Sequence, residues 1–143
     1  RQNLTEGAGG NGAGSGATGR GDAAPQIAHD YVNLADKTSA LATGESAQDF
    51  EVPYDMTLVE VQGHLSTAQT SGSIATFDVK VNTVSILSTK ITIDNNERSS
   101  LTAATQPVIS APSLSRGDRV TFHVDQAGTG GKGPSVKLLH YPR

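Results

Sequence analysis

Hydrophobic and polar residues alternate along several short stretches of the sequence. The alternation is regular over 50–58, 75–81 and 120–124, where every second residue is apolar. A period of two predicts a β-strand with one buried and one exposed face. Weaker patterns predict further strands at 27–34, 84–94, 108–109 and 136–140.

Two positions interrupt the pattern between residues 50 and 65. Pro53 has no backbone N–H to donate, so it indicates a sheet edge or a bulge. The apolar phase slips by one residue at Leu58-Val59 and then continues to Leu65, as a β-bulge would produce. Residues 37–48 mix small and polar side chains and are predicted as a loop.

The predicted strands are short and are separated by turn-forming sequences. Turns are predicted at 70–73, 82–83, 94–97 and 115–118, and no stretch shows sustained helical periodicity. About eight short strands in this arrangement predict an all-β protein, an antiparallel β-sandwich of jelly-roll type. We assign this domain to residues 27–143.

Residues 1–26 differ from the rest and are interpreted as an extended, glycine-rich N-terminal arm. Half of the protein's 16 glycines lie there, at Gly7, Gly9, Gly10, Gly12, Gly14, Gly16, Gly19 and Gly21. Glycine has no side-chain bulk and reaches conformations that other residues avoid, so such an arm can follow a narrow path between other subunits. We therefore predict that these glycines form an anchor to partner proteins.

Composition disfavours several classes of function. The net charge is −3 and the basic residues are scattered, which argues against nucleic acid as a partner because phosphate binding needs a concentrated basic face. The chain has no cysteine, so it forms neither disulfides nor thiolate metal sites. No stretch reaches the length of an apolar membrane span, and we expect no membrane partner.

No set of residues forms a recognisable catalytic motif. His29, His64, His123 and His140 fall in different predicted strands without the spacing of a local ligand set, and we expect surface or hydrogen-bonded structural roles for them. No Gly-x-Ser-x-Gly motif occurs, and only 4% of residues are aromatic, which is few for a sugar-cleaving cleft. We therefore predict a protein that is not an enzyme and has no catalytic residue, metal or cofactor.

Three short motifs have a chemical interpretation and a simpler structural one. Gly128–Gly133 resembles a phosphate-binding loop but lacks the Gly-Lys-Ser/Thr ending and the following helix, so a long hairpin loop is predicted. Asp94–Glu97 offers four oxygen-bearing side chains, yet neighbours within one turn rarely converge on calcium. The integrin tripeptide Arg-Gly-Asp occurs at 20–22 and 116–118, and the second copy is predicted as a turn before a strand.

Three pieces of the sequence are distinctive: Pro53-Tyr54, the run SILSTKITID at 85–94, and Val124-Asp125-Gln126. With the sequence around them, from Phe50 to Leu139, they resemble a small β-sandwich module of tailed-bacteriophage virion proteins. That module occurs in fibre, tail and head-surface proteins, and the resemblance carries over no active-site residue.

The resemblance implies a building block of a phage particle, located in the virion after assembly in the host bacterial cytoplasm. The leading hypothesis is a capsid decoration (cement) or head-fibre protein, a homotrimer whose arm docks on the major capsid protein or on sister subunits. The second is a tail-fibre or tail-spike component, joined to a tail or adaptor protein, whose sandwich binds a host surface glycan. The third, from another class, is a free carbohydrate-binding module or small hydrolase.

Overall fold

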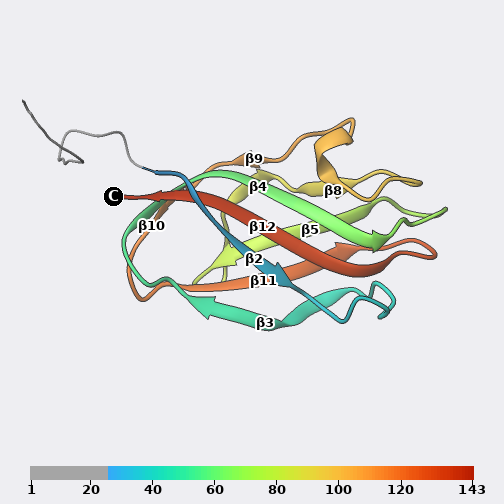
Figure 1. Cartoon of the computed structure of the whole chain (residues 1–143), viewed down its shortest axis with the longest axis horizontal. Coiled ribbons are helices and arrows are strands. Elements are labelled where there is room, and N and C mark those ends of the chain that lie inside the picture. Colours follow the sequence, from blue (N-terminus) through green and yellow to red (C-terminus); the bar gives the residue numbers. More distant parts are fainter. Residues whose placement is uncertain (1–25) are drawn as a thin grey trace, which may run out of the picture.

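Two antiparallel sheets pack face to face across one hydrophobic core (Figure 1). The computed structural model describes residues 26–143. The first sheet has the order β10-β4-β12-β2 and comprises β2 (Ala28–Asn33), β4 (Met56–Thr67), β10 (Ser113–Leu114) and β12 (Lys132–Pro142). The second has the order β3-β11-β5-β6, with β8 also paired to β5, and comprises β3 (Gly44–Glu51), β5 (Ala75–Val81), β6 (Val84–Ser85), β8 (Ile91–Ile93) and β11 (Arg119–Gln126).

The chain connects these strands in jelly-roll order, which confirms the predicted fold class. Consecutive strands from β2 to β5 alternate between the two sheets, as do β10, β11 and β12. Outside the two sheets, β7 (Leu87–Thr89) pairs with β9 (Val108–Ile109), and η1 (Ser100–Thr102) is one turn of 3-10 helix. In the described part of the chain, no helix has the length and hydrophobicity to cross a membrane.

The alternating run at 50–58 does not form the single strand that its pattern predicts. β3 ends at Glu51 and β4 begins at Met56, and these strands lie in different sheets. Val52 and Met56 are both buried, so the period of two persists while the chain crosses from one sheet to the other. Pro53 lies in this crossing, where no ladder hydrogen bond is required of it.

The prediction of a loop over 37–48 is wrong at its C-terminal end, where residues 44–48 belong to β3. β3 lies at the edge of its sheet beside β11, and most of its side chains are exposed. It therefore has no continuous apolar face that an alternating pattern would reveal. Backbone pairing with the well-patterned β11 holds it in the sheet.

The phase slip at Leu58-Val59 is a β-bulge, as predicted. Leu139 of β12 pairs with Glu60 and His140 pairs with Leu58, which leaves Val59 as the extra residue on β4. The side chain of Val59 is 47% exposed, whereas Leu58 beside it is buried. The bulge thus turns one apolar side chain out of the core.

The first and last described strands lie side by side. In the register of β2 and β12, Ala28 faces His140 and Asn33 faces Ser135. The described chain therefore enters and leaves the sandwich at the same end, where the blue start of β2 and the mark C lie together in Figure 1.

The core is built from the alternating positions of both sheets. Phe77 and Ile91 from the second sheet and Leu65 from the first are completely buried. Gly63 of β4 lies against this layer, where a side chain would collide with it. An added Cβ would lie 2.8 Å from Ile91 Cγ2 and 3.0 Å from Phe77 Cδ2, so glycine is required for the close approach of the two sheets.

We predict that Gly63→Ala lowers the free energy of unfolding by about 1–3 kcal/mol, because the added methyl group overpacks the core. Gly131→Ala is the matched control, since its Cβ would lie 3.4 Å or more from its neighbours, an ordinary contact. Denaturant unfolding of both variants measures the difference. Equal stability of the two variants would contradict the packing of Gly63 against Phe77.

Candidate functional site

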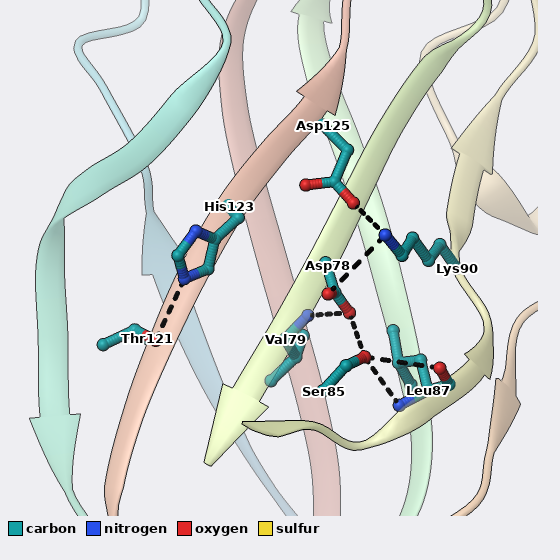
Figure 2. A network of polar contacts seen from close by, with 8 residues as sticks. All are labelled: Asp78, Val79, Ser85, Leu87, Lys90, Thr121, His123 and Asp125. Carbon is teal, nitrogen blue, oxygen red and sulfur yellow. Dashed lines mark hydrogen bonds and ion pairs between the residues drawn. The ribbon is translucent and has the colours of Figure 1, made fainter. Parts of the chain in front are cut away.

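The outer face of the second sheet carries a buried carboxylate (Figure 2). Asp78 lies on β5 between Phe77 and Val79, whose side chains enter the core, so its own side chain projects from the opposite face. Only 1% of Asp78 is exposed. The Ser85 hydroxyl donates to Asp78 Oδ1 at 2.6 Å, and the Val79 N–H donates to the same oxygen at 2.9 Å. The carboxylate thereby holds β5 and β6 together.

Lys90 joins this carboxylate to a second one on the neighbouring strand. Its Nζ donates to Asp125 Oδ2 and lies 3.8 Å from Asp78 Oδ2. The hydrogen bond to Asp125, with a contribution from the two negative charges, raises the pKa of Lys90. The ammonium group therefore stays protonated and links β5, β11 and the segment before β8.

His123 lies on the same outer face, as the alternation in β11 predicts. Its Nε2 lies 3.2 Å from Thr121 Oγ1 and 3.8 Å from Glu45 Oε1. These side chains line a polar groove of about 490 Å³ to which Lys80 and Arg119 also contribute. The groove presents hydrogen-bonding groups of both charges and suits a polar ligand.

His140 has the second of the two roles expected of it, because it is buried and hydrogen-bonded and does not lie on the surface. It shares the inward phase of Val136 and Leu138 on β12 and is 2% exposed. Its Nδ1 lies 3.4 Å from the Tyr54 hydroxyl, and its Nε2 lies 3.0 Å from Asp30 Oδ2. Despite this short distance, Nε2 forms no regular hydrogen bond within residues 26–143. The cluster closes the end of the core where the chain enters and leaves.

At the opposite end of the sandwich, the buried Gln69 ties three loops together. The Gly128 N–H donates to Gln69 Oε1 at 2.7 Å, while Gln69 Nε2 donates to Ser73 O at 2.6 Å and to Asn95 Oδ1 at 2.8 Å. An added Cβ at Gly128 would lie 2.6 Å from Gln69 Nε2. The glycine-rich segment is therefore a tightly packed loop, and packing accounts for Gly128. The prediction of a hairpin is wrong, because the segment connects β11 to β12 and these strands lie in different sheets.

Three of the four side chains at 94–97 use an oxygen atom in hydrogen bonds within the protein. Asp94 Oδ2 accepts the Ala104 N–H at 3.0 Å, and Glu97 Oε1 accepts the Thr102 hydroxyl at 2.6 Å. Across residues 26–143, no three His, Cys, Asp or Glu side chains are grouped as a metal ion would need. The turn is held by these hydrogen bonds.

Residues 115–118 form the predicted turn before β11. Asp118 accepts the Ser115 N–H at 2.8 Å and Asn82 Nδ2 at 3.0 Å, and these two bonds lower the pKa of its carboxyl group. Gly117 has a φ of 92°, a conformation that favours glycine. This turn accounts for the second Arg-Gly-Asp sequence. The first copy, and the predicted anchor glycines between Gly7 and Gly21, lie outside the described residues.

Exposed hydrophobic side chains gather beside the bulge. Val59, Leu101 and Val108 are 47%, 58% and 50% exposed, and all three line one groove of about 490 Å³. We call this groove, between β4, η1 and β9, the edge groove. Alternation alone does not reveal it, because the bulge turns Val59 outward and Leu101 lies in a weakly patterned stretch.

The chain matches no protein-family model, no curated protein and no solved structure. The resemblance to phage virion modules therefore stays a prediction. The jelly-roll fold, the polar outer face and the edge groove are the features from which a function has to be inferred.

We predict that Asp78→Ala lowers the free energy of unfolding by about 2 kcal/mol. The substitution leaves the buried Ser85 and Val79 donors without their acceptor, and it removes one of the two negative charges beside Lys90. Asp49→Ala is the matched control, because Asp49 is a partly exposed partner of Arg119 and a surface ion pair contributes at most about 1 kcal/mol. Urea unfolding compares them. If Asp78→Ala costs no more than Asp49→Ala, the buried network does not hold the hairpin.

We predict that His64 titrates below the usual histidine pKa of about 6.5. Partial burial, followed by the positive charges of Arg98 and Lys137, lowers the pKa of its ring. The contribution of the neutral ring to stability is complete above the unfolded-state pKa and is lost as the pH falls to the lower folded-state value.

NMR titration of the His64 ring measures this pKa in the unchanged protein and in Arg98→Gln, which should raise the midpoint. Lys80→Gln, which changes a residue of the other sheet, is the control and should leave the midpoint where it is. A midpoint that Arg98→Gln does not move would contradict the assigned cause.

Proposed function

We propose that the protein is a non-enzymatic structural component of a bacteriophage particle, most specifically a capsid decoration or head-fibre protein anchored by residues 1–26. The jelly-roll body stands on the particle, and the arm contacts the major capsid protein or sister subunits of a homotrimer. The resemblance over Phe50 to Leu139 motivates the phage assignment. Two-sheet jelly rolls are also a recurrent architecture of viral capsid domains.

The proposal rests on where the polar and the exposed apolar side chains lie in residues 26–143. Asp78, Gln69 and Asp118 accept or donate hydrogen bonds that stabilise hairpins and loops. Of the seven large exposed hydrophobic side chains among residues 26–143, three (Val59, Leu101 and Val108) gather at the edge groove. A rigid body with a localised apolar contact surface is suited to assembly with other proteins.

The composition of residues 1–26 supports an anchoring role. Such a segment spans on the order of 85 Å when extended, which is enough to reach a neighbouring subunit. Ordering it costs roughly 1–2 kcal/mol per residue, so many contacts have to compensate. A repetitive particle surface supplies those contacts on every subunit.

The polar groove on the outer face supports a second candidate, a tail-fibre or tail-spike component that binds a host surface glycan. Glu45, Lys80 and His123 offer donors and acceptors for sugar hydroxyl groups. A glycan array with the unchanged protein and with Lys80→Glu tests it. Binding that the substitution weakens would favour this candidate, and an array without any bound glycan would remove it.

We predict that deletion of residues 1–24 abolishes incorporation into particles, because the body loses its anchor. The control is Lys80→Glu, which should be incorporated normally. Thermal unfolding of the shortened protein checks that the body still folds, and particle reconstruction locates the intact protein. Normal incorporation of the shortened protein would rule out the anchor, and a location on the tail alone would rule out head decoration.

A further inference from the structure

The outer edge of β4 is paired at both of its ends. The Leu58 N–H donates to Pro112 O at 2.8 Å, and the Leu65 N–H donates to Arg98 O at 2.8 Å. The Gly63 N–H also points away from β12 and donates to Ser100 Oγ at 2.9 Å. Loop residues therefore cover this edge on both sides of Val61.

Val61 is the gap in this edge. On β12, Val61 pairs with Leu138 and Gly63 pairs with Val136. Backbone groups two residues apart on a strand point to the same side, so the N–H and C=O of Val61 point away from β12, as those of Gly63 do. No backbone or side-chain acceptor among residues 26–143 takes the Val61 N–H. A buried backbone N–H normally has a partner, so this position calls for an acceptor from outside the described residues.

The edge groove lies at this gap. Val61 and the exposed Val59, Leu101 and Val108 all line it. Ser100 and Pro112, which cover Gly63 and Leu58 on either side of Val61, also line the groove, so the uncovered part of the edge is short. The groove thus has the requirements of strand addition: a free backbone pair and an apolar pocket beside it.

The sequence itself supplies a segment that fits. The 25 residues that precede Gln26 contain one large apolar side chain, Leu4, in the run Gln2–Glu6. From Leu4 to β2, about 24 residues can span on the order of 80 Å. β2 lies two strands away from β4 in the same sheet, about 10 Å at the usual strand spacing. Length therefore allows the run to reach the groove of its own molecule or of a neighbour.

We propose that Gln2–Glu6 adds a short strand to β4 at Val61 and places the side chain of Leu4 in the edge groove. This inference rests on the anchoring role proposed for residues 1–26 and names the surface that the arm grips. A carbonyl of the added strand accepts the Val61 N–H, and one of its N–H groups donates to Val61 O. Between neighbouring copies, the same contact joins subunits without any surface beyond the groove.

Hydrogen exchange at the Val61 amide tests the proposal in the full-length chain. We expect slow exchange in the unchanged protein and at least tenfold faster exchange in Leu4→Asp, because the charge removes Leu4 from the apolar groove. Ala17→Asp adds the same charge elsewhere in the arm and should leave the exchange rate unchanged. Equal rates at Val61 in the unchanged protein and in Leu4→Asp would overturn the proposal.

Disulfide trapping gives an independent readout, because the chain has no cysteine of its own. Under mild oxidation, Leu4→Cys combined with Val108→Cys should form a disulfide, whereas Leu4→Cys combined with Val84→Cys should not. Val84 is 67% exposed but does not line the groove. Cross-linked monomers or dimers both support the proposal and identify whose groove is filled, and equal trapping by the two pairs would overturn it.

The anchoring role is tested separately from this contact. If Leu4→Asp changes neither exchange nor trapping while deletion of residues 1–24 still abolishes incorporation, the arm anchors the protein elsewhere and only the contact with β4 is wrong. If the deletion has no effect on incorporation, the proposed function itself fails.

Discussion

Burial of the alternating faces of two sheets against each other is the interaction on which the rest of the structure depends. Phe77 and Leu65 belong to the same core and have no exposed surface, and Gly63 is small enough to let the sheets approach. Because this packing fixes which residues face inward, outward-facing residues and loops have to satisfy their hydrogen bonds locally. Asp78 and Gln69 are the result: each is buried, and each is bonded to groups from a neighbouring element.

The sequence predicts those parts of the fold that apolar side chains define. The strands at 75–81 and 120–124, the bulge at Leu58-Val59 and the turn at 82–83, where both residues have positive φ, all follow from local patterns. The start of β3 was not predicted, because this strand is held by backbone pairing with β11 and its own side chains are mostly exposed. The run at 50–58 is divided between two sheets because alternation records burial and says nothing about which sheet a residue joins.

The candidate sites were less predictable because their members lie far apart in the sequence. Asp78 and Asp125 meet through Lys90, and no spacing rule connects three residues on different segments. His140 occupies an ordinary apolar phase, which indicates burial but not the carboxylate of Asp30 beside it. The glycine-rich segment could be recognised as a loop, but not as a connection between the two sheets, and the need for glycine at Gly128 becomes visible only against Gln69.

The pairing of β2 with β12 has a mechanical consequence. Ala28 faces His140, so a pulling force applied between the two ends of the described chain acts across the outermost rung of an antiparallel pair. Such a load is borne by one pair of hydrogen bonds at a time, and the strands would separate like a zipper. A force applied parallel to β2 would instead shear all the hydrogen bonds of the pair at once, and the pair would resist separation far better.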